Sequence, residues 1–416
     1  MLPAILSANN NKHPCRNTLI YSSNHSALVP CYAPVMKTPT LIQSLTQLVA
    51  APSVSSTSPG WDQDNRKVIE LLDQWFSSLG FTTLIQPIPG CPDKFNLIAS
   101  AGSGEQGLVL AGHTDTVPYD EGRWQVDPFK LSERDNRLYG LGSCDMKGFF
   151  SLVLEAVRDL DLKQLKQPLT IIATADEETT MCGAKALGNL GQHLGRHVVI
   201  GEPTSNRPIR MHKGMMMRAL RIRGSSGHSS DPSLGNSALD AMQAAMQELL
   251  EWRKQLQENY RNPLFAVEVP TLNLGHIHGG DSPNRICAEC ELHFDLRPLP
   301  GMNLDQLHGE IEQLIEKRLG DRGLQITLEK TFDGIPPMET AAEAAIVKAA
   351  ESLTGHQAET VAFGTEAPYF NAMGMETVVM GPGDIAQAHQ PNEFVAIDQL
   401  QPGVDILKSL IKKFCL

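Results

Sequence analysis

Histidine and carboxylate side chains stand at or just after short apolar runs in five segments of the chain. The segments are AGHTDTVP with His113 and Asp115, GLGSCDMKG with Asp145, TADEET with Glu177 and Glu178, IGEPT with Glu202, and QAHQPNE with His389. Strand ends are where α/β sheets place ligands, so we expect these side chains to meet at one edge of a sheet. Two histidines and several carboxylates suit two zinc-like ions bridged by a carboxylate. Such a pair activates water and polarises a carbonyl group.

Each of these residues also has an ordinary structural interpretation. A single histidine after a strand is more often a hydrogen-bonded loop residue, and Asp115 alone is typical of a turn. Glu177 and Glu178 suit the first turn of a helix, where the helix dipole favours acids. The joint occurrence favours the metal site, with spacings of 32, 32, 25 and 187 residues along His113, Asp145, Glu177, Glu202 and His389.

The elements that must position these residues alternate between helices and apolar strands. Residues 65–81 and 146–160 have helical spacing, with Gly80 as a stop signal, and a further helix is expected around Ala184–Leu194. Apolar runs of strand length cover 94–100, 107–113, 169–176 and 197–203. This alternation predicts an α/β sheet with a largely parallel core.

From about residue 213 the pattern changes to strand, helix, strand, strand, helix, strand. The helices are expected at 237–257 and 303–319, and the order is that of the ferredoxin-like split motif. The α/β pattern then returns, so the sequence predicts a small α+β domain, 213–331, inserted into a larger one, 37–212 and 332–416. Residues 1–36 are rich in Asn, Ser and Pro without a period, and we expect a disordered extension there.

These motifs resemble the M20 family of di-zinc amidohydrolases and peptidases. The resemblance covers about residues 40–416 and rests on HTDTVP, DMKG, ADEE, GEPT, GHSSDP, NLGHIHGGDSPNRIC and AHQPNE. It implies a di-zinc peptidase-like catalytic domain with an inserted ferredoxin-like lid and dimerisation domain. By this resemblance His113 and Glu202 bind one metal, Glu178 and His389 bind the other, and Asp145 bridges them.

The resemblance also assigns the residues around the metals. Glu177 is the general base, and Asp115 holds the imidazole of His113 in place. His228, in GSSGHSSDP, reaches the active site of the partner subunit and stabilises the developing oxyanion there. Residues that hold substrate carboxylates in relatives match Lys213, Asn284, Arg297, Gly364 and Thr365. A surface role for His228 and a structural ion pair for Arg297 remain alternatives.

The expected reaction is hydrolysis of N2-acetyl-L-ornithine to L-ornithine and acetate in arginine biosynthesis. This substrate carries one ammonium besides its carboxylate, so an acid should contact that ammonium. We expect Glu366, in FGTEAPYF, to be this acid. Capping of nearby amides by Glu366 is the alternative. Other M20 reactions, such as desuccinylation of succinyl-diaminopimelate or an aminoacylase reaction, remain open, as does a non-catalytic binding protein. The expected cofactors are two Zn²⁺ or Co²⁺ ions per subunit. The family resemblance also implies glutathione as an activator, but no residue in the sequence indicates it.

Composition limits the partners. Thirty-five basic and 47 acidic residues give a net charge of −12, which argues against nucleic acid or anionic lipid. No apolar run of about 18 residues occurs, so we expect no membrane helix. Eight cysteines are few for 416 residues, and we expect Cys287 and Cys290 to be buried and reduced on opposite faces of a strand. We expect a cytoplasmic enzyme that acts on a small molecule, and the family resemblance implies a homodimer.

Overall fold

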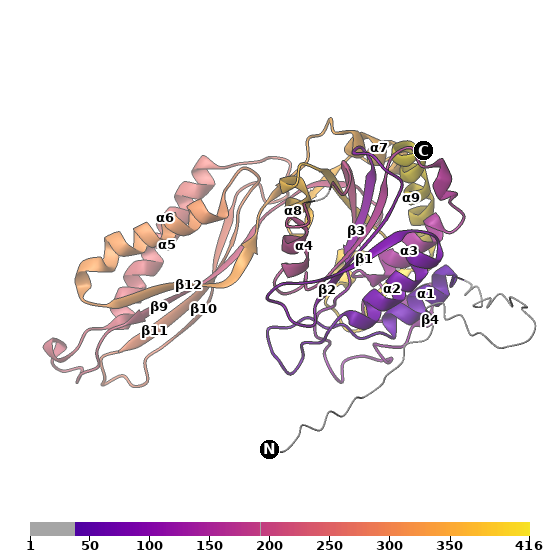
Figure 1. Cartoon of the computed structure of the whole chain (residues 1–416). Coiled ribbons are helices and arrows are strands. Elements are labelled where there is room, and N and C mark those ends of the chain that lie inside the picture. Colours follow the sequence, from indigo (N-terminus) through magenta and orange to yellow (C-terminus); the bar gives the residue numbers. More distant parts are fainter. Residues whose placement is uncertain (1–37, 192) are drawn as a thin grey trace, which may run out of the picture. The chain divides into compact units, whose positions relative to one another are not determined.

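The computed structural model describes residues 38–191 and 193–416 (Figure 1). The extension predicted for residues 1–36 lies outside the described residues. Among the described residues, no helix is both long enough and apolar enough to cross a membrane.

The larger sheet carries the site at its centre. Its strand order is β1-β2-β6-β3-β7-β15-β8-β13, with β14 paired to β8. The bounds are β1 Thr82–Pro87, β2 Phe95–Ala101, β3 Leu108–His113, β6 Leu169–Thr174, β7 His197–Pro203, β8 Ile209–His212, β13 Met338–Glu339, β14 Glu359–Val361 and β15 Glu376–Gly381. Strands β6, β3, β7 and β15 are mutually parallel, whereas β1, β2 and β13 pair antiparallel. The predicted parallel core is confirmed for these four central strands.

Both faces of this sheet are covered, which is why its strands read as continuous apolar runs. Along β3, Leu108 and Leu110 pack into one hydrophobic cluster, and Val109 and Ala111 pack into another on the opposite face. The first cluster holds side chains of α1 Leu41–Val49, α2 Arg66–Ser78, α3 Lys147–Val157, α7 Ala345–Thr354 and α9 Leu400–Cys415. The second holds side chains of α4 Cys182–Leu187 and α8 Ala367–Ala372.

The helix expected around Ala184–Leu194 is shorter than predicted. Helix α4 ends at Leu187, before Gly188, and Gly191 has a positive φ of 62°. Two glycines within four residues remove helix propensity, so the chain leaves the helix early. Helix α2, in contrast, ends just before Gly80, whose φ of 94° makes it the predicted stop.

The second sheet is antiparallel and has the strand order β10-β11-β9-β12. Its elements are β9 Met215–Arg223, α5 Ala238–Asn259, β10 Thr271–Gly279, β11 Glu289–Arg297, α6 Leu304–Leu319 and β12 Gln325–Ile335. They follow one another in the predicted β-α-β-β-α-β order. Both helices pack their apolar residues on one face of the sheet, as Figure 1 shows. The chain enters this unit after β8 and leaves it before β13, and these two strands pair with each other.

Cys287 and Cys290 are buried and free, as expected, but they do not lie on opposite faces. Both pack into the hydrophobic cluster between this sheet and its helices. The prediction was wrong on this point because β11 begins only at Glu289, so the alternation of strand side chains does not extend to Cys287.

A third, small sheet lies beside the site. It has the order β16-β5-β4, from β4 Ser132–Arg134, β5 Arg137–Tyr139 and β16 Phe394–Ala396. Strand β16 pairs antiparallel with β5, which brings the segment that follows His389 alongside the segment that precedes Asp145.

Candidate functional site

The predicted metal ligands come from three adjacent parallel strands and two loops. His113 is the last residue of β3, Glu177 and Glu178 follow β6, and Glu202 lies near the end of β7. Asp145 stands just before α3, and His389 stands in the loop between β15 and β16. Neighbouring parallel strands have their carboxyl ends at the same edge of the sheet. Segments far apart in the sequence therefore meet there.

The structure links all five predicted ligands through close contacts between pairs of them. Nε2 of His113 lies 3.2 Å from Oδ1 of Asp145 and 3.9 Å from a carboxylate oxygen of Glu202. Nε2 of His389 lies 3.5 Å from the other oxygen of Asp145 and 3.1 Å from Glu178.

Three residue groups at this edge have the geometry to hold a metal ion. The ligand atoms within each group lie within 4.8 Å of one another, and the groups are His113–Asp145–Glu202, Asp145–Glu178–His389 and His113–Glu177–Glu178. The first two share Asp145, whose two oxygens face one histidine each. A carboxylate in that position can bridge two cations.

Asp115 organises the other side of His113. Its carboxylate accepts the backbone N–H groups of Glu177 and Glu178, at 3.2 and 3.1 Å. Nδ1 of His113 lies 3.6 Å from the same carboxylate and 3.1 Å from the carbonyl oxygen of Asp115. A proton on Nδ1 therefore has an acceptor, which directs the lone pair of Nε2 towards Asp145 and Glu202.

The turn that carries the two glutamates is held by Asp176. This residue has a positive φ of 60°, and its carboxylate accepts the hydroxyl groups of Ser55, at 2.8 Å, and Thr180. The ammonium group of Lys94 lies 3.5 Å from the same carboxylate and is almost fully buried. The sequence analysis assigned no role to Asp176, although it lies within the ADEE motif.

Burial perturbs the acids of the site. It raises the pKa of Glu177 and Glu202 well above the ordinary value, and neighbouring carboxylates add to the effect. The pKa of Glu178 is also raised, first by burial and then by Asp145. The hydrogen bond with Glu178 raises the pKa of His389 to about 9. Several carboxylates packed together away from water favour a compensating cation.

A cavity of about 560 Å³ opens at these residues. Glu177, Glu178 and His389 form part of its lining, and many of the other lining residues are apolar. The apolar residues include Met181, Met215, Met217, Phe332, Ile335 and Phe363. Met215 and Met217 lie on β9, and periodicity alone does not show that side chains of a strand line a cavity.

Two of the predicted substrate-binding residues line this cavity, Arg297 and Gly364. Nε of Arg297 donates to both carboxylate oxygens of Asp295, at 3.1 and 2.9 Å. Among the described residues, these are the only hydrogen bonds of the Arg297 side chain. Its two terminal nitrogens therefore remain available to a ligand. Such a fork matches a carboxylate.

Three other predicted contacts are buried and do not line the cavity. Lys213 donates to the carbonyl oxygen of Val269, at 2.7 Å, and its ammonium lies over the ring of Phe265. Thr365 is buried and accepts the N–H of Ala367. Glu366 is fully buried at the start of α8, where burial raises its pKa to about 7. These side chains contact the protein interior rather than the open cavity.

His228 and Asn284 lie together elsewhere on the inserted domain. His228 forms a backbone bridge with Arg285, and the N–H of Ser229 donates to the carbonyl oxygen of Asn284, at 3.1 Å. Nδ1 of His228 lies 2.7 Å from the hydroxyl group of Ser230. Neither His228 nor Asn284 is among the residues that line the 560 Å³ cavity. Both residues are exposed.

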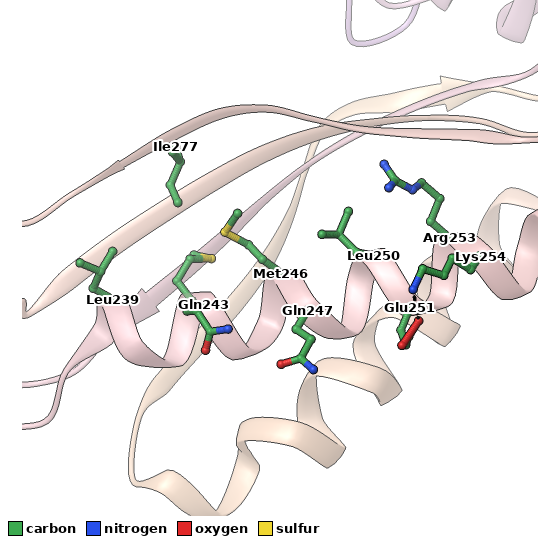
Figure 2. Close-up of a pocket in the computed structure, with 10 residues that line it drawn as sticks. Leu239, Gln243, Met246, Gln247, Leu250, Glu251, Arg253, Lys254 and Ile277 are labelled. Carbon is green, nitrogen blue, oxygen red and sulfur yellow. Dashed lines mark ion pairs between the residues drawn. The ribbon is translucent and has the colours of Figure 1, made fainter.

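A second cavity, of about 570 Å³, lies between α5 and the edge strand β10 and contains none of the predicted metal ligands. Figure 2 shows Leu239, Met246 and Leu250 projecting from α5 on the side where Ile277 projects from β10. Leu239 and Ile277 are nearly half exposed, at 46% and 47%. This apolar surface is defined here as the α5–β10 surface.

Comparison with known proteins agrees with the motifs and the fold. A model of peptidase family M20/M25/M40 matches residues 109–413. The chain is 50% identical over 379 residues to the acetylornithine deacetylase of Pasteurella multocida, which covers 91% of this chain and 99% of that protein.

Two solved structures share the fold at low sequence identity. An aminopeptidase of Bacillus cereus superposes with a TM-score of 0.70 at 19% identity, covering 91% of this chain and 99% of that one. A dinuclear metal-binding peptidase of family M20 from Bacillus subtilis gives a TM-score of 0.60 at 16% identity, with coverage of 89% and 97%.

Proposed function

The chain belongs to peptidase family M20/M25/M40, and on this premise we propose that it hydrolyses N2-acetyl-L-ornithine to L-ornithine and acetate. The observation that carries the proposal is the pair of ligand groups that share Asp145, with the carboxylate of Glu177 beside them. The substrate is taken from the acetylornithine deacetylase that is half identical over nearly its whole length. We further propose that the reaction serves arginine biosynthesis in the cytoplasm.

The side chains fit a dinuclear metal centre. His113, Asp145 and Glu202 would hold one divalent cation, and Asp145, Glu178 and His389 would hold the second. Imidazole nitrogens mixed with carboxylate oxygens suit Zn²⁺ or Co²⁺, which we propose as the native ions. The raised pKa values of Glu177, Glu178 and Glu202 reflect buried negative charge that two cations would compensate. When bound, the two ions supply Lewis acidity to the amide carbonyl and to water.

Glu177 is the residue that moves the proton. It lines the cavity, and it is absent from both of the groups that share Asp145, so its carboxylate is available as a base. Asp115 fixes its backbone N–H, which keeps the carboxylate at the cavity wall. Glu177 takes a proton from the attacking water and gives it to the nitrogen of the leaving amine, so that the α-amine of ornithine departs neutral. The second proton of that water leaves with acetic acid, which ionises to acetate.

Arg297 is the proposed partner of the substrate carboxylate. Among the residues that line the cavity, all of them in the described part of the chain, it is the single Arg or Lys. One guanidinium suits acetylornithine, which has one carboxylate, better than succinyl-diaminopimelate, which has more. Methionine and phenylalanine side chains that line the cavity would contact the aliphatic part of the substrate.

A substrate panel tests this proposal. The protein is stripped with a chelator, reloaded with Zn²⁺ or Co²⁺, and assayed for amine release from acetylornithine, succinyl-diaminopimelate and acetyl amino acids without a side-chain amine. We expect the highest kcat/KM for acetylornithine and no turnover without metal. Higher kcat/KM for succinyl-diaminopimelate would contradict the assignment. Growth of an arginine auxotroph lacking its own deacetylase would test the pathway.

We also propose that the protein is a homodimer formed through the α5–β10 surface. Strand β10 is at the edge of its sheet, so one side of its backbone is open to pairing, and the exposed leucine and isoleucine lie beside it. Leu239→Glu combined with Met246→Glu should convert a dimer into a monomer in light scattering. Leu353→Glu, at a position of α7 that is 39% exposed, is the matched control. A double variant that stays dimeric would exclude this surface.

A further inference from the structure

Glu393 is a buried acid next to the proposed metal ligands that the proposed reaction does not use. It is 2% exposed and lies four residues after His389. Its carboxylate accepts three backbone N–H groups, from Gly142 at 3.0 Å, Cys144 at 2.8 Å and Asp145 at 2.9 Å. Its own carbonyl oxygen accepts a fourth, from Gly140 at 3.1 Å. Four hydrogen bonds thus join one residue to the whole segment that leads to Asp145.

These bonds continue the pairing of the small sheet. Strand β16 starts at Phe394 and pairs with β5, which ends at Tyr139, so Glu393 and Gly140 are the next residues along the same ladder. The backbone register therefore places Glu393 beside the turn at 140–145. Its side chain then replaces the ladder, because residues 142–145 bend away and their N–H groups need another acceptor.

The position of Asp145 depends on this turn. One of its oxygens lies 3.2 Å from Nε2 of His113, and the other lies 3.5 Å from Nε2 of His389. A shift of its backbone would move both oxygens at once. Glu393 holds the N–H of Asp145 directly and belongs to the same segment as His389, so it couples the bridging ligand to a ligand of the second ion.

Two other charged groups, Lys147 and Asp145, interact electrostatically with Glu393. Lys147 is fully buried, donates to the carbonyl oxygen of Ala51 at 3.0 Å, and interacts electrostatically with Glu393 and Asp115. Asp145 is the other charged group that acts on Glu393. Burial raises the pKa of Glu393 to about 7, Asp145 adds to this rise, and the three N–H hydrogen bonds act against it.

We infer that Glu393 is a positioning residue of the metal centre, which sets the backbone of Asp145 before metal binds and so supports both ions together. This inference rests on the proposed dinuclear site. It predicts a signature that loss of a ligand to one ion does not give: loss of His389 weakens one ion first, whereas a defect at Glu393 weakens both, because Asp145 is common to the two ligand groups.

Glu393→Gln is the sharpest variant because it keeps the shape of the side chain. One oxygen of the carboxylate accepts from Cys144 and Asp145, and the other accepts from Gly142. A glutamine can accept hydrogen bonds only through its carbonyl oxygen. Its NH₂ group is a donor and would face a backbone N–H group, which is also a donor. Glu376→Gln is the control, because Glu376 also accepts a backbone N–H, from Ala345 at 3.2 Å, but lies at the start of β15.

The test measures metal affinity rather than turnover. Metal-free proteins are titrated with Zn²⁺ against a chromophoric chelator, and the visible absorption of bound Co²⁺ is recorded. We expect Glu393→Gln to weaken both ions by about 10–100-fold and to change the Co²⁺ spectrum. His389→Ala should weaken mainly one ion, and Glu376→Gln neither. Wild-type affinity for both ions in Glu393→Gln, even with lower thermal stability, would overturn the inference.

Hydrogen exchange of the wild-type protein provides a second measurement should the variant fail to fold. If Glu393 orders the turn, the amides of Gly142, Cys144 and Asp145 exchange slowly in the metal-free protein as well as in the loaded one. Fast exchange of these amides without metal would overturn the inference. A wild-type protein that binds fewer than two ions would instead contradict the proposed metal centre, so the two failures are distinguishable.

Discussion

Two neighbouring glutamates at the end of β6 differ in what surrounds them. Both give their backbone N–H groups to Asp115, but Glu178 contacts His389 at 3.1 Å, whereas Glu177 is absent from the two groups that share Asp145. One carboxylate is therefore committed to a cation, and the other is available for proton transfer. The two carboxylates still lie close together, because both also belong to a group with His113 whose ligand atoms lie within 4.8 Å of one another.

Replacing Glu177 by Gln should remove turnover and leave metal binding intact. Glutamine keeps the volume of the side chain but cannot accept the proton, which should lower kcat by about 10²–10⁴-fold. Metal content by elemental analysis, together with steady-state kinetics on acetylornithine, checks this. Wild-type rates, or a variant that has lost both ions, would contradict the assignment of Glu177 as the base.

His212, at the end of β8, is a buried residue whose protonation should destabilise the protein. It is fully buried, its Nδ1 lies 2.8 Å from the carbonyl oxygen of Lys213, and its Nε2 has no hydrogen-bond partner among the described residues. Burial lowers the pKa of His212 to about 4, from an ordinary value of 6.5. The unfolded chain therefore binds a proton between these values that the folded protein excludes.

The sign of the pH effect follows from this depressed pKa. The contribution of neutral His212 is complete above pH 6.5 and is lost as the pH falls from 6.5 to 4. Its size is about 3 kcal/mol, at roughly 1.4 kcal/mol per pKa unit. Denaturant unfolding at several pH values, compared between the wild type and His212→Gln, checks it. The variant should lose less stability on acidification, and parallel curves would show that His212 does not contribute.

At the scale of single residues, the sequence predicted which side chains come together when they stand at or near the end of a strand. His113, Glu178 and Glu202 were found in this way, and the structure brings them together with Asp145 and His389. Glu393 was missed because its partners are backbone N–H groups, which leave no pattern in the sequence. The burial of Glu366 was missed because a loop sequence does not show which of its residues packs under α8.

At the scale of elements, the packing of β7 against α3 sets the position of Glu202. Gly201 precedes this ligand, and a Cβ atom there would meet the ring of Phe149, on α3, at 2.0 Å. The strand can pass this close to the helix only without a side chain. The parallel strands were predictable because both of their faces are apolar, whereas the early end of α4 depended on two glycines.

Gly201→Ala should therefore destabilise the protein by about 1–3 kcal/mol and weaken metal binding, because the overpacked strand displaces Glu202. The measurements are denaturant unfolding of the metal-free protein and a Zn²⁺ titration. Gly309→Ala is the matched control: Gly309 lies within α6 with nothing within 4 Å of the added atom, so this change should stabilise by about 0.5–1 kcal/mol. Wild-type stability and affinity in Gly201→Ala would contradict the argument.

At the scale of the whole molecule, two residues predicted for the active site lie outside the cavity of their own chain. His228 and Asn284 lie together on loops of the inserted domain, exposed and outside the 560 Å³ cavity. We propose that in a homodimer His228 of one chain acts at the cavity of the other. An oxyanion donor of this kind contributes about 10²–10³-fold to kcat, so His228→Ala should lower kcat by that amount and leave both ions bound.

Subunit exchange then tests whether His228 acts across the dimer. Glu177→Gln and His228→Ala proteins, each nearly inactive, are mixed and allowed to exchange subunits. A mixed dimer combines the intact Glu177 of one chain with the intact His228 of the other at one site, while its second site lacks both. Random pairing makes about half of the dimers mixed, so about a quarter of all sites should recover activity. If His228 acted within its own chain, every site would lack one residue, and verified exchange without recovered activity would exclude the cross-subunit role.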